Sequence, residues 1–320
     1  MKRNIQDLIA EPCGIILEKK RLASLIYELT VYAPAIVHNA QPGQFVIAIE
    51  KERDSKPVPL TIADIDRSAG TITLVVQAVK KYSTRLLTME VGEKFFALQG
   101  PTGHPSEIKK YDGTVVCVAG GVGAAPMYPV VRALAEAGND VHVIIGAREY
   151  KYLFWYDKFV PLALAYGKIT LCIEEGEVSP YHVKGRVTLP LEALLANKEK
   201  HIARVFAAGP IPMLKAISKL TIQYGVPNTS SAVAQMIDGT GMCGGCQCNV
   251  GGKKVLLCQH GPEIDGNLAD WDTLNTRLNS CRPEEDAAMA EFAANDPAYR
   301  KFLKMEGLSV PELTQIKKEI

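Results

Sequence analysis

The chain has 320 residues, of which 47% are hydrophobic and 22% are charged, and its formal net charge at pH 7 is +1. This size and composition predict two to three globular domains, and the near-neutral charge without a long basic run argues against nucleic acid or an anionic membrane as a partner. No apolar segment follows residues 1–7 and nowhere do eighteen apolar residues run together, so we expect a cytoplasmic protein and not a membrane protein.

The first third of the chain, which we place at residues 1–107, is predicted to form an antiparallel β-barrel or sandwich. From Gly14 to about Leu98, short runs rich in β-forming residues alternate with Pro and Gly. This alternation is typical of all-β domains. The strand-like runs lie at 25–31, 44–49, 71–79 and 94–98.

Residues 108–222 have a different pattern, in which strands alternate with helices. Strands are predicted at 115–119, 141–145, 169–173 and 204–208, and helices at 127–137, 155–165 and 189–196. Such alternation predicts a parallel sheet in a doubly wound α/β domain. The remainder, 223–320, is predicted to be a small Gly-rich module around the cysteines followed by a helical tail, with helix at 287–292 and 311–320. The whole is thus an α+β multidomain chain.

A glycine-rich turn follows the first strand of the α/β domain. The strand ends at Ala119, and the turn that leads into the next helix reads Gly120, Gly121, Val122, Gly123, Ala124, Ala125, Pro126. In this strand–turn–helix context, glycines let backbone amides approach a pyrophosphate at a helix N-terminus. We therefore predict nucleotide binding here, in preference to a plain tight turn. Gly209 and Pro210 end another predicted strand at the sheet edge where ligands of such folds bind, although a plain turn explains that pair equally well.

The cysteines favour a metal site over disulfides. Four of the eight crowd into residues 243–258 and the others lie far apart, which suits a reducing compartment. Asp238, Cys243, Cys246 and Cys258 follow one another at intervals of four, two and eleven residues. The three cysteines match the last three places of an iron–sulfur ligand pattern, and Asp238 takes the first, so a [2Fe–2S] cluster is the leading hypothesis. Structural zinc is the alternative, and Cys248 is either a buried bystander or a substitute ligand.

Several stretches of the first domain resemble the flavin-binding segments of the ferredoxin–NADP reductase superfamily. They read Pro59-Leu60-Thr61, Val76-Gln77-Ala78 and Ser83-Thr84, before Gly100-Pro101. The resemblance implies FAD, with the first segment against the flavin ring and ribityl chain and the Ser83-Thr84 pair at the pyrophosphate. Pro57 and Val58 stand where many members have an Arg, so that Lys56, Arg85 or backbone amides would supply the phosphate contacts instead.

The cluster segment resembles the small subunit of NADH-dependent ferredoxin:NADP oxidoreductase, also called a sulfide dehydrogenase subunit. The similar residues are 238–246 and 258–266, and the order of flavin, nucleotide and cluster motifs matches over residues 10 to 280. A more distant relative, the electron-transfer subunit of dihydroorotate dehydrogenase, has cysteine in place of Asp238. The resemblance implies that Asp238 is the fourth cluster ligand, beside Cys243, Cys246 and Cys258.

The residues that would select the nicotinamide cofactor disagree with one another. Glu174 and Glu175 favour the free ribose of NAD, whereas Arg148 favours the 2′-phosphate of NADP. The resemblance favours NAD(H), with NADP(H) as the alternative. We also assign Met213, shortly after Gly209 and Pro210, to the cofactor site.

These motifs predict an electron-transfer flavoprotein without a catalytic side chain. Electrons would pass between NAD(H), FAD and the cluster, because a flavin converts between a hydride and single electrons. By resemblance, the partner is a larger flavoprotein subunit with FAD and iron–sulfur clusters that serves ferredoxin indirectly, in flavin-based electron bifurcation. The alternatives are a stand-alone NAD(P)H-dependent ferredoxin or polysulfide reductase, a dihydroorotate dehydrogenase-type subunit, and a zinc-bearing interaction protein.

Overall fold

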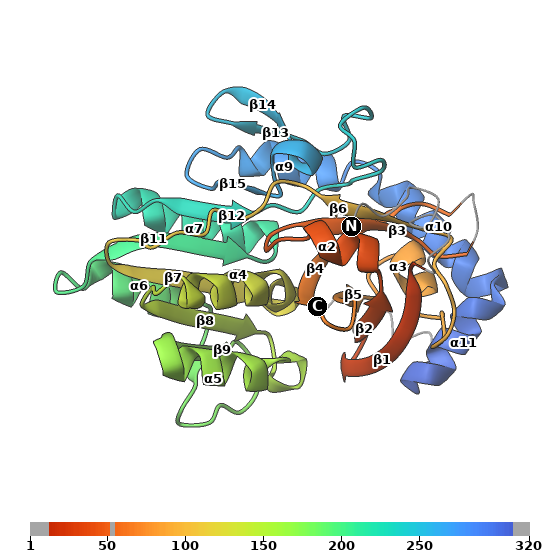
Figure 1. The fold of residues 1–320 in the computed structure, drawn as a ribbon, viewed down its shortest axis with the longest axis horizontal. Helices are drawn as coiled ribbons and strands as arrows, with labels where there is room; N and C mark the ends of the chain where they lie inside the picture. Colours follow the sequence, from red (N-terminus) through yellow and green to blue (C-terminus); the bar gives the residue numbers. More distant parts are fainter. Residues whose placement is uncertain (1–12, 52–54, 310–320) are drawn as a thin grey trace.

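A computed structural model describes residues 13–51 and 55–309 of the chain. A six-stranded antiparallel sheet and a seven-stranded, mainly parallel sheet lie next to each other, and a two-stranded hairpin belongs to a third, smaller part (Figure 1). The predicted α+β fold class is confirmed. In the described part of the chain, no helix combines the length and the apolar character that a membrane span requires. The predictions for residues 1–12 and for a helix at 311–320 lie outside the described residues.

The six-stranded sheet curls into a barrel. Its strands are β1 (Ile15–Ala23), β2 (Ile26–Tyr32), β3 (Phe45–Ile49), β4 (Val58–Asp66), β5 (Thr71–Gln77) and β6 (Ala97–Thr102), in the spatial order β1-β2-β5-β4-β3-β6. Neighbouring strands are all antiparallel. The chain just before β6 bonds back to β1, since Phe95 N donates to Gly14 O and Ile16 N donates to Glu93 O. Two short helices, α2 (Pro34–Asn39) and α3 (Lys81–Leu86), belong to this part.

The second sheet is doubly wound. Its strands are β7 (Thr114–Gly120), β8 (Val141–Ala147), β9 (Gly167–Ile173), β10 (Val183–Lys184), β11 (Ile202–Ala208), β12 (Asn228–Ser231) and β15 (Glu263–Asp265), in the order β10-β9-β8-β7-β11-β12-β15. All pairs are parallel except β12 with β15. The chain moves outward from β7 to β10 and then returns to β11. The reversal of strand order between β7 and β11 is the point at which such folds bind ligands.

Alternate side chains of β7 separate the two faces of this sheet. Cys117 packs in one core with α4 (Ala124–Glu136) and α5 (Tyr156–Tyr166), whereas Val116 packs in another with α6 (Thr188–Ala196) and α7 (Ile211–Gln223). Successive residues of a strand point to opposite faces, so a run of consecutive apolar residues is what a strand covered on both faces requires. The apolar run of β7 satisfies this condition.

The cluster segment is an insertion between two strands of the nucleotide sheet. Residues 232–262 leave from β12 and return as β15, which pairs with β12 at Thr229–Asp265. Between them lie the hairpin β13 (Gln247–Val250) and β14 (Lys253–Leu256) and helix α8 (Leu257–His260), and α9 (Trp271–Leu278) follows. The nucleotide sheet therefore extends past the boundary predicted at residue 222, because two short strands pair across the insertion.

The C-terminal tail packs on the barrel. It forms α10 (Arg282–Asn295), which includes the helix predicted at 287–292, and α11 (Pro297–Glu306). The tail aromatics Phe292, Tyr299 and Phe302 are buried in the same core as the barrel strands. In Figure 1 both helices lie beside the barrel, away from β8 and β9. The tail thus belongs spatially with the barrel, although we assigned it in sequence to the cluster module.

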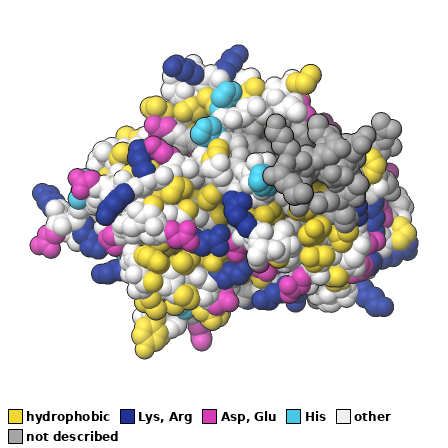
Figure 2. Space-filling model, in the orientation of Figure 1, with side chains coloured by type: hydrophobic (Ala, Val, Ile, Leu, Met, Phe, Trp, Pro, Cys, Tyr) yellow, Lys and Arg dark blue, Asp and Glu magenta, His cyan; other side chains and the backbone are white. Residues whose placement is uncertain are grey.

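On the face shown in Figure 2, lysine and arginine side chains are interspersed with aspartate and glutamate. No single-sign patch dominates that face, in keeping with the formal net charge of +1.

Candidate functional site

A cleft of about 440 Å³ lies where the barrel meets the carboxyl ends of β7 and β11. Side chains from both sheets contribute to its walls. The predicted cofactor residues that line it are Pro59, Leu60, Thr61, Val76, Gln77, Ser83, Gly120, Gly121, Val122, Gly123, Pro126, Arg148, Gly209 and Pro210. The structure therefore brings most of the predicted flavin and nucleotide residues to one place, at the switch point of the doubly wound sheet.

Four predicted residues do not line this cleft: Ala78, Thr84, Ala124 and Met213. Ala78 and Ala124 are buried directly beside residues that do. Met213 lies behind the two turns, because its Sδ would be only 2.4 Å from a Cβ on Gly120 and its Cε 2.4 Å from one on Gly209. Met213 consequently supports the turns by packing and does not face the cleft.

The barrel wall of the cleft comes from β4, β5 and α3. Leu60 of β4 is opposite Val46 of β3 in the antiparallel register, and its side chain is almost fully buried. Thr61 and Gln77 are half-buried and line the cleft. This wall is thus mainly apolar with a few hydrogen-bonding groups, which is the usual composition of a site for a cofactor with an aromatic ring.

The Ser83-Thr84 pair is divided between the cleft and the barrel core. Ser83 lines the cleft, and its Oγ accepts from Val79 N at 3.2 Å and from Lys80 N at 3.1 Å. Thr84 is 0% exposed, and its Oγ1 lacks a hydrogen-bond partner among the described residues. Adjacent residues of a helix point about 100° apart, so only Ser83 faces the cleft. The predicted pyrophosphate contact is therefore retained for Ser83 alone.

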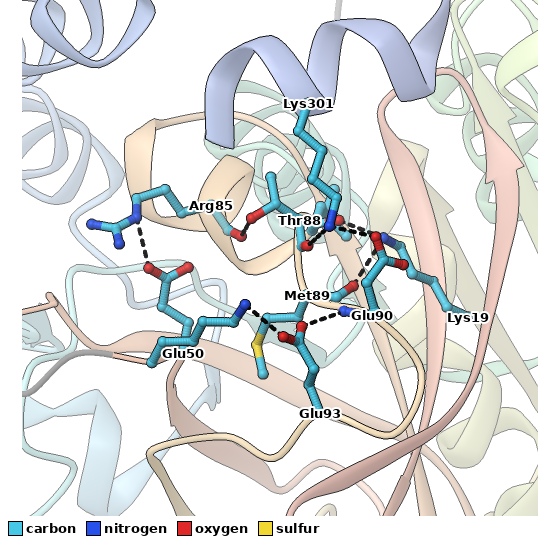
Figure 3. Close-up of polar contacts among 10 residues, drawn as sticks. Lys19, Glu50, Arg85, Thr88, Met89, Glu90, Glu93 and Lys301 are labelled. Carbon is cyan, nitrogen blue, oxygen red and sulfur yellow. Dashed lines mark hydrogen bonds and ion pairs between the residues drawn. The ribbon is translucent and has the colours of Figure 1, made fainter. Parts of the chain in front are cut away.

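Arg85, one candidate for a phosphate contact, is engaged on the barrel. Its Nε lies 2.7 Å from Oε1 of Glu50, and the two side chains are 16% and 5% exposed (Figure 3). The positive charge of Arg85 therefore neutralises a buried carboxylate. Lys56, the other candidate, lies over the ring of Tyr82 at 5.9 Å.

The two glycine turns pack against each other so tightly that side chains are excluded. A Cβ on Gly123 would lie 2.2 Å from the carbonyl oxygen of Ala208, the last residue of β11. Gly121 has φ +54°, in the left-handed region that favours glycine. Helix α4 starts directly after this turn at Ala124, so its unpaired N–H groups and positive dipole end are at the cleft. The residues present fit a pyrophosphate group.

Arg148 and Glu175, predicted to favour opposite cofactors, form an ion pair. Arg148 Nε lies 2.9 Å from Glu175 Oε1, and Arg148 lines the cleft. Glu174 pairs with Arg186 at 3.4 Å. Arg148 is thus paired with one of the two acidic candidates, at the ends of β8 and β9, and the other acidic candidate is paired with Arg186.

The structure brings two of the four predicted cluster ligands together. Cys246 and Cys258 are each 1% exposed, and the backbone N–H of Cys258 donates to Cys246 Sγ at 3.3 Å. Burial, together with the neighbouring Cys246, raises the pKa of the Cys258 thiol to about 11. Cys243 is exposed at the surface of the same loop. Within the described ranges, three or more His, Cys, Asp or Glu side chains do not gather as metal ligands, so the ligand set stays a prediction.

Asp238 closes the start of the cluster loop. Its two carboxylate oxygens accept from Thr240 N at 2.8 Å and Cys243 N at 2.9 Å. These hydrogen bonds hold the pKa of the Asp238 carboxyl below its usual range. Gly239 and Gly241 have φ values of +69° and +87°, which the wrapping of this loop requires. The carboxylate and two thiols of this loop, together with the Cys258 thiol of α8, fit an iron–sulfur cluster by donor type.

Cys248 lies on β13, directly after this loop. It is buried in a core that contains Trp271 and Leu274 of α9 as well as Cys246 and Cys258, and its thiol donates to the backbone oxygen of Asn249 at 3.7 Å. Burial raises the pKa of its thiol. The packing favours the bystander interpretation of Cys248 over a role as substitute ligand.

One wall of the cleft leads directly into the cluster loop, which the sequence reasoning missed. Ala232, Ala234 and Met236 line the cleft, and Asp238 follows two residues later. Recognising β12 as a strand would have predicted this wall, because the carboxyl end of every parallel strand near the switch point faces the ligand site. The polar sequence of β12 does not resemble a buried strand, so the strand was not predicted.

Two protein families match parts of the chain. The iron–sulfur cluster binding domain of dihydroorotate dehydrogenase B matches residues 234–269. The oxidoreductase NAD-binding domain matches residues 117–219. These ranges contain the cluster loop and the glycine turns respectively.

Whole-chain similarity extends beyond these domains. A Thermotoga maritima protein named dihydroorotate dehydrogenase B (NAD(+)), electron transfer subunit homolog, is 34% identical over 92% of this chain and 97% of its own. An uncharacterized protein of the adh 3′ region of Clostridium beijerinckii is 37% identical over 86% and 93%. A solved structure of NADH-dependent reduced ferredoxin-NADP oxidoreductase, described for flavin-based electron bifurcation, is similar with 32% identity and a TM-score of 0.81, over 89% of this chain and 99% of that one.

Proposed function

Because the chain belongs to the family of dihydroorotate dehydrogenase B electron transfer subunits and their homologues, we propose that it passes electrons between NAD(H), FAD and a [2Fe–2S] cluster, and from there to a larger partner subunit. The observation that carries this proposal is the single cleft shared by the flavin-type segments and the glycine turns, with a wall that continues into the cluster loop.

Each wall of the cleft has a distinct task in this proposal. Pro59, Leu60 and Thr61 would lie against the FAD ring, with Gln77 and Ser83 as hydrogen-bonding groups. The glycine turns would hold a pyrophosphate through backbone N–H groups, without needing a basic side chain. When bound, FAD supplies the exchange between a hydride and single electrons. The apolar lining would exclude water and orient the flavin ring and the nicotinamide ring.

The composition of the lining suits chemistry performed by cofactors. The described residues around the cleft are mostly apolar side chains and glycines, and they include no carboxylate, histidine or thiol. Protein groups of this kind bind and orient. We therefore assign no catalytic side chain.

The choice of nicotinamide cofactor, the type of activity and the composition of the partner are proposed from local charge and from similarity. We propose NAD(H) over NADP(H), because Glu175 neutralises Arg148, which would otherwise attract a 2′-phosphate. We propose a ferredoxin–NAD(P) reductase type of activity with a partner that contains FAD and iron–sulfur clusters, supported by the similarity to the bifurcating oxidoreductase. Ferredoxin would then be served through the partner, and a cytoplasmic location remains our prediction.

Purification of the protein from its native cells, with subunit and cofactor analysis, tests the proposal. A larger flavin and iron–sulfur subunit should co-purify with this chain. If the chain purifies alone and reduces ferredoxin or polysulfide with NAD(P)H, the stand-alone reductase is correct instead. If the complex oxidises dihydroorotate, the partner is of the dihydroorotate dehydrogenase type, in line with the name of the Thermotoga relative.

A further inference from the structure

Two segments that are far apart in the sequence form neighbouring parts of the cleft wall. Val79 comes from the loop that leads into α3 and Ser83 from the first turn of α3, both on the proposed flavin side. Ala232, Ala234 and Met236 come from the segment that leads into the cluster loop. The separation of these two segments therefore bears on the separation of the two redox groups.

One carboxylate of the C-terminal tail contacts both segments. Glu285, in the first turn of α10, places Oε2 2.5 Å from Nζ of Lys80, which lies between Val79 and Ser83. Its Oε1 accepts from Nε2 of Gln235, which lies between Ala234 and Met236, at 3.4 Å. Each oxygen thus serves a different segment. The Glu285 side chain is only 25% exposed, so the ion pair is less screened by water than a fully exposed one.

Gln235 in turn contacts the loop of the predicted ligands. The backbone carbonyl oxygen of Gln235 lies 3.3 Å from the position that a Cβ on Gly245 would occupy. Gly245 stands between Cys243 and Cys246 in the sequence. A displacement of Gln235 would therefore press on the cluster loop or leave it unsupported.

The helix that carries Glu285 is itself fixed to the barrel. Phe292 of α10 is buried in the barrel core. Its ring packs edge to face against that of Tyr299 of α11, which is buried in the same core, with 5.2 Å between the ring centroids. A bridge mounted on such an anchored helix holds its two partners at a defined distance, since packing locks the side chains that support it.

We infer that Glu285 is a positioning residue that sets the spacing between FAD and the cluster, by holding Lys80 on the flavin side and Gln235 on the cluster side. This inference rests on the proposed function, because it needs both redox groups. It gives a role to the tail, whose motifs are not used for binding either group.

Glu285→Gln tests the bridge, because it removes the charge that attracts Lys80 and keeps the shape and an oxygen for Gln235. The dissociation constant of FAD, measured by flavin fluorescence, should rise about two- to fivefold, as loss of a partly exposed ion pair predicts. In stopped-flow mixing with NADH, flavin bleaching should keep its rate. Cluster reduction should slow by about two- to tenfold, because small displacements change rates strongly.

Lys301→Ala is the matched control. It breaks the ion pair between Lys301 Nζ of α11 and Glu90 Oε1, which is also 2.5 Å long but involves neither Lys80 nor Gln235 (Figure 3). Cluster reduction should remain at the wild-type rate in this variant. The double variant Lys80→Glu with Glu285→Lys restores the ion pair with reversed charges, and the Gln235 amide can rotate to accept from the new lysine, so it should recover most of the lost rate.

Two kinetic results would overturn the inference. One is an unchanged cluster-reduction rate in Glu285→Gln, and the other is an equal slowing in Lys301→Ala, which would make the tail a general stabiliser. Hydrogen exchange of the apoprotein gives a readout that needs no cofactor. Peptides with residues 79–83 and 231–236 should exchange faster in Glu285→Gln than in Lys301→Ala. A protein without flavin or iron would refute the proposed function, whereas equal exchange in both variants would refute the bridge.

Discussion

At Gly123 the backbone of one turn touches the backbone of the next. A methyl group there would lie 2.2 Å from the carbonyl oxygen of Ala208, well inside van der Waals contact. Gly121 is the opposite case, with φ +54° and open space around its Cβ position. The two glycines are thus required for different reasons, contact at one and backbone conformation at the other.

This difference predicts distinct effects of the same substitution. Gly123→Ala should separate the two turns and weaken NADH binding at least about tenfold, because the anion-binding backbone is displaced. Gly121→Ala should lower stability by about 1–2 kcal/mol, the cost of a left-handed non-glycine residue. Isothermal titration with NADH and thermal unfolding would separate the two effects. Equal NADH affinity in wild type and Gly123→Ala would contradict the packing argument.

Glu263 is a carboxyl whose pKa is raised by the fold. Burial raises its pKa to about 7, although the hydrogen bond from Ser106 and the positive charges of Arg204 and His104 oppose the rise. The Ser106 hydroxyl donates to its Oε1 at 2.7 Å. Between the unfolded pKa near 4.5 and the folded value near 7, the native state holds more protons than the unfolded state. Stability contributed by this group is therefore lost as pH rises through that window.

Glu263→Gln should remove this pH dependence, since a glutamine amide stays neutral and still accepts from Ser106. The variant should gain about 1–2 kcal/mol over wild type between pH 5 and pH 8, which is about 2 to 4 °C in melting temperature. Thermal unfolding at several pH values in that range is the measurement. Parallel pH profiles for both proteins would show that Glu263 is ionised throughout.

Asp238 is proposed to bind iron through oxygen, a harder ligand than a thiolate. Asp238→Cys should therefore retain the cluster but change its reduction potential and its EPR spectrum. Cys248→Ser is the matched control, and its spectrum should equal that of wild type because the Cys248 thiol donates to the backbone oxygen of Asn249 and is not assigned to the cluster. An unchanged spectrum in Asp238→Cys would count against the carboxylate ligand.

The tail helix α11 contributes buried side chains to the barrel core. Phe302 is fully buried in the barrel core, and Arg300 on the same helix is exposed. Phe302→Ala should cost about 3–5 kcal/mol through lost contacts and a cavity, whereas Arg300→Ala should change stability by less than about 0.5 kcal/mol. Thermal unfolding of both variants tests this. Similar melting temperatures for the two would contradict the docking of the tail.

The long apolar elements could be predicted from sequence, and the short polar ones could not. The runs at 115–119 and 141–145 are covered by β7 and β8 to within two residues, because strands buried on both faces need consecutive apolar side chains. β12, with the sequence Asn-Thr-Ser-Ser, and the three-residue β15 lack that pattern. Their pairing depends on a contact across the inserted cluster segment, which local sequence does not encode.

The same limit applies to the candidate site. The glycine turns were predicted from their strand–turn–helix context and the Pro59-Leu60-Thr61 segment from its family resemblance. Both line the cleft. Whether Thr84 or Ser83 faces the cleft depends on how α3 is rotated by its packing partners. The same is true of Met213 on α7, whose side chain turns behind the cleft.

At the scale of the molecule, the cleft exists because two domains are held face to face. Arg132 of α4 pairs with Asp64 of β4 at 2.7 Å. Trp155 Nε1, just before α5, donates to Glu28 Oε2 of β2 at 2.6 Å. These polar contacts fix the barrel against the nucleotide sheet, and the tail joins the barrel to the cluster segment. The barrel, the nucleotide sheet and the cluster segment are therefore held together around the cleft.

An anaerobic titration of the purified protein with NADH, followed by EPR, tests the central claim most directly. The account predicts that NADH produces the EPR signal of a reduced [2Fe–2S] cluster while the flavin absorption bleaches, in a sample with about two irons per chain. Zinc in place of iron, or bleaching of the flavin without any cluster signal, would contradict it.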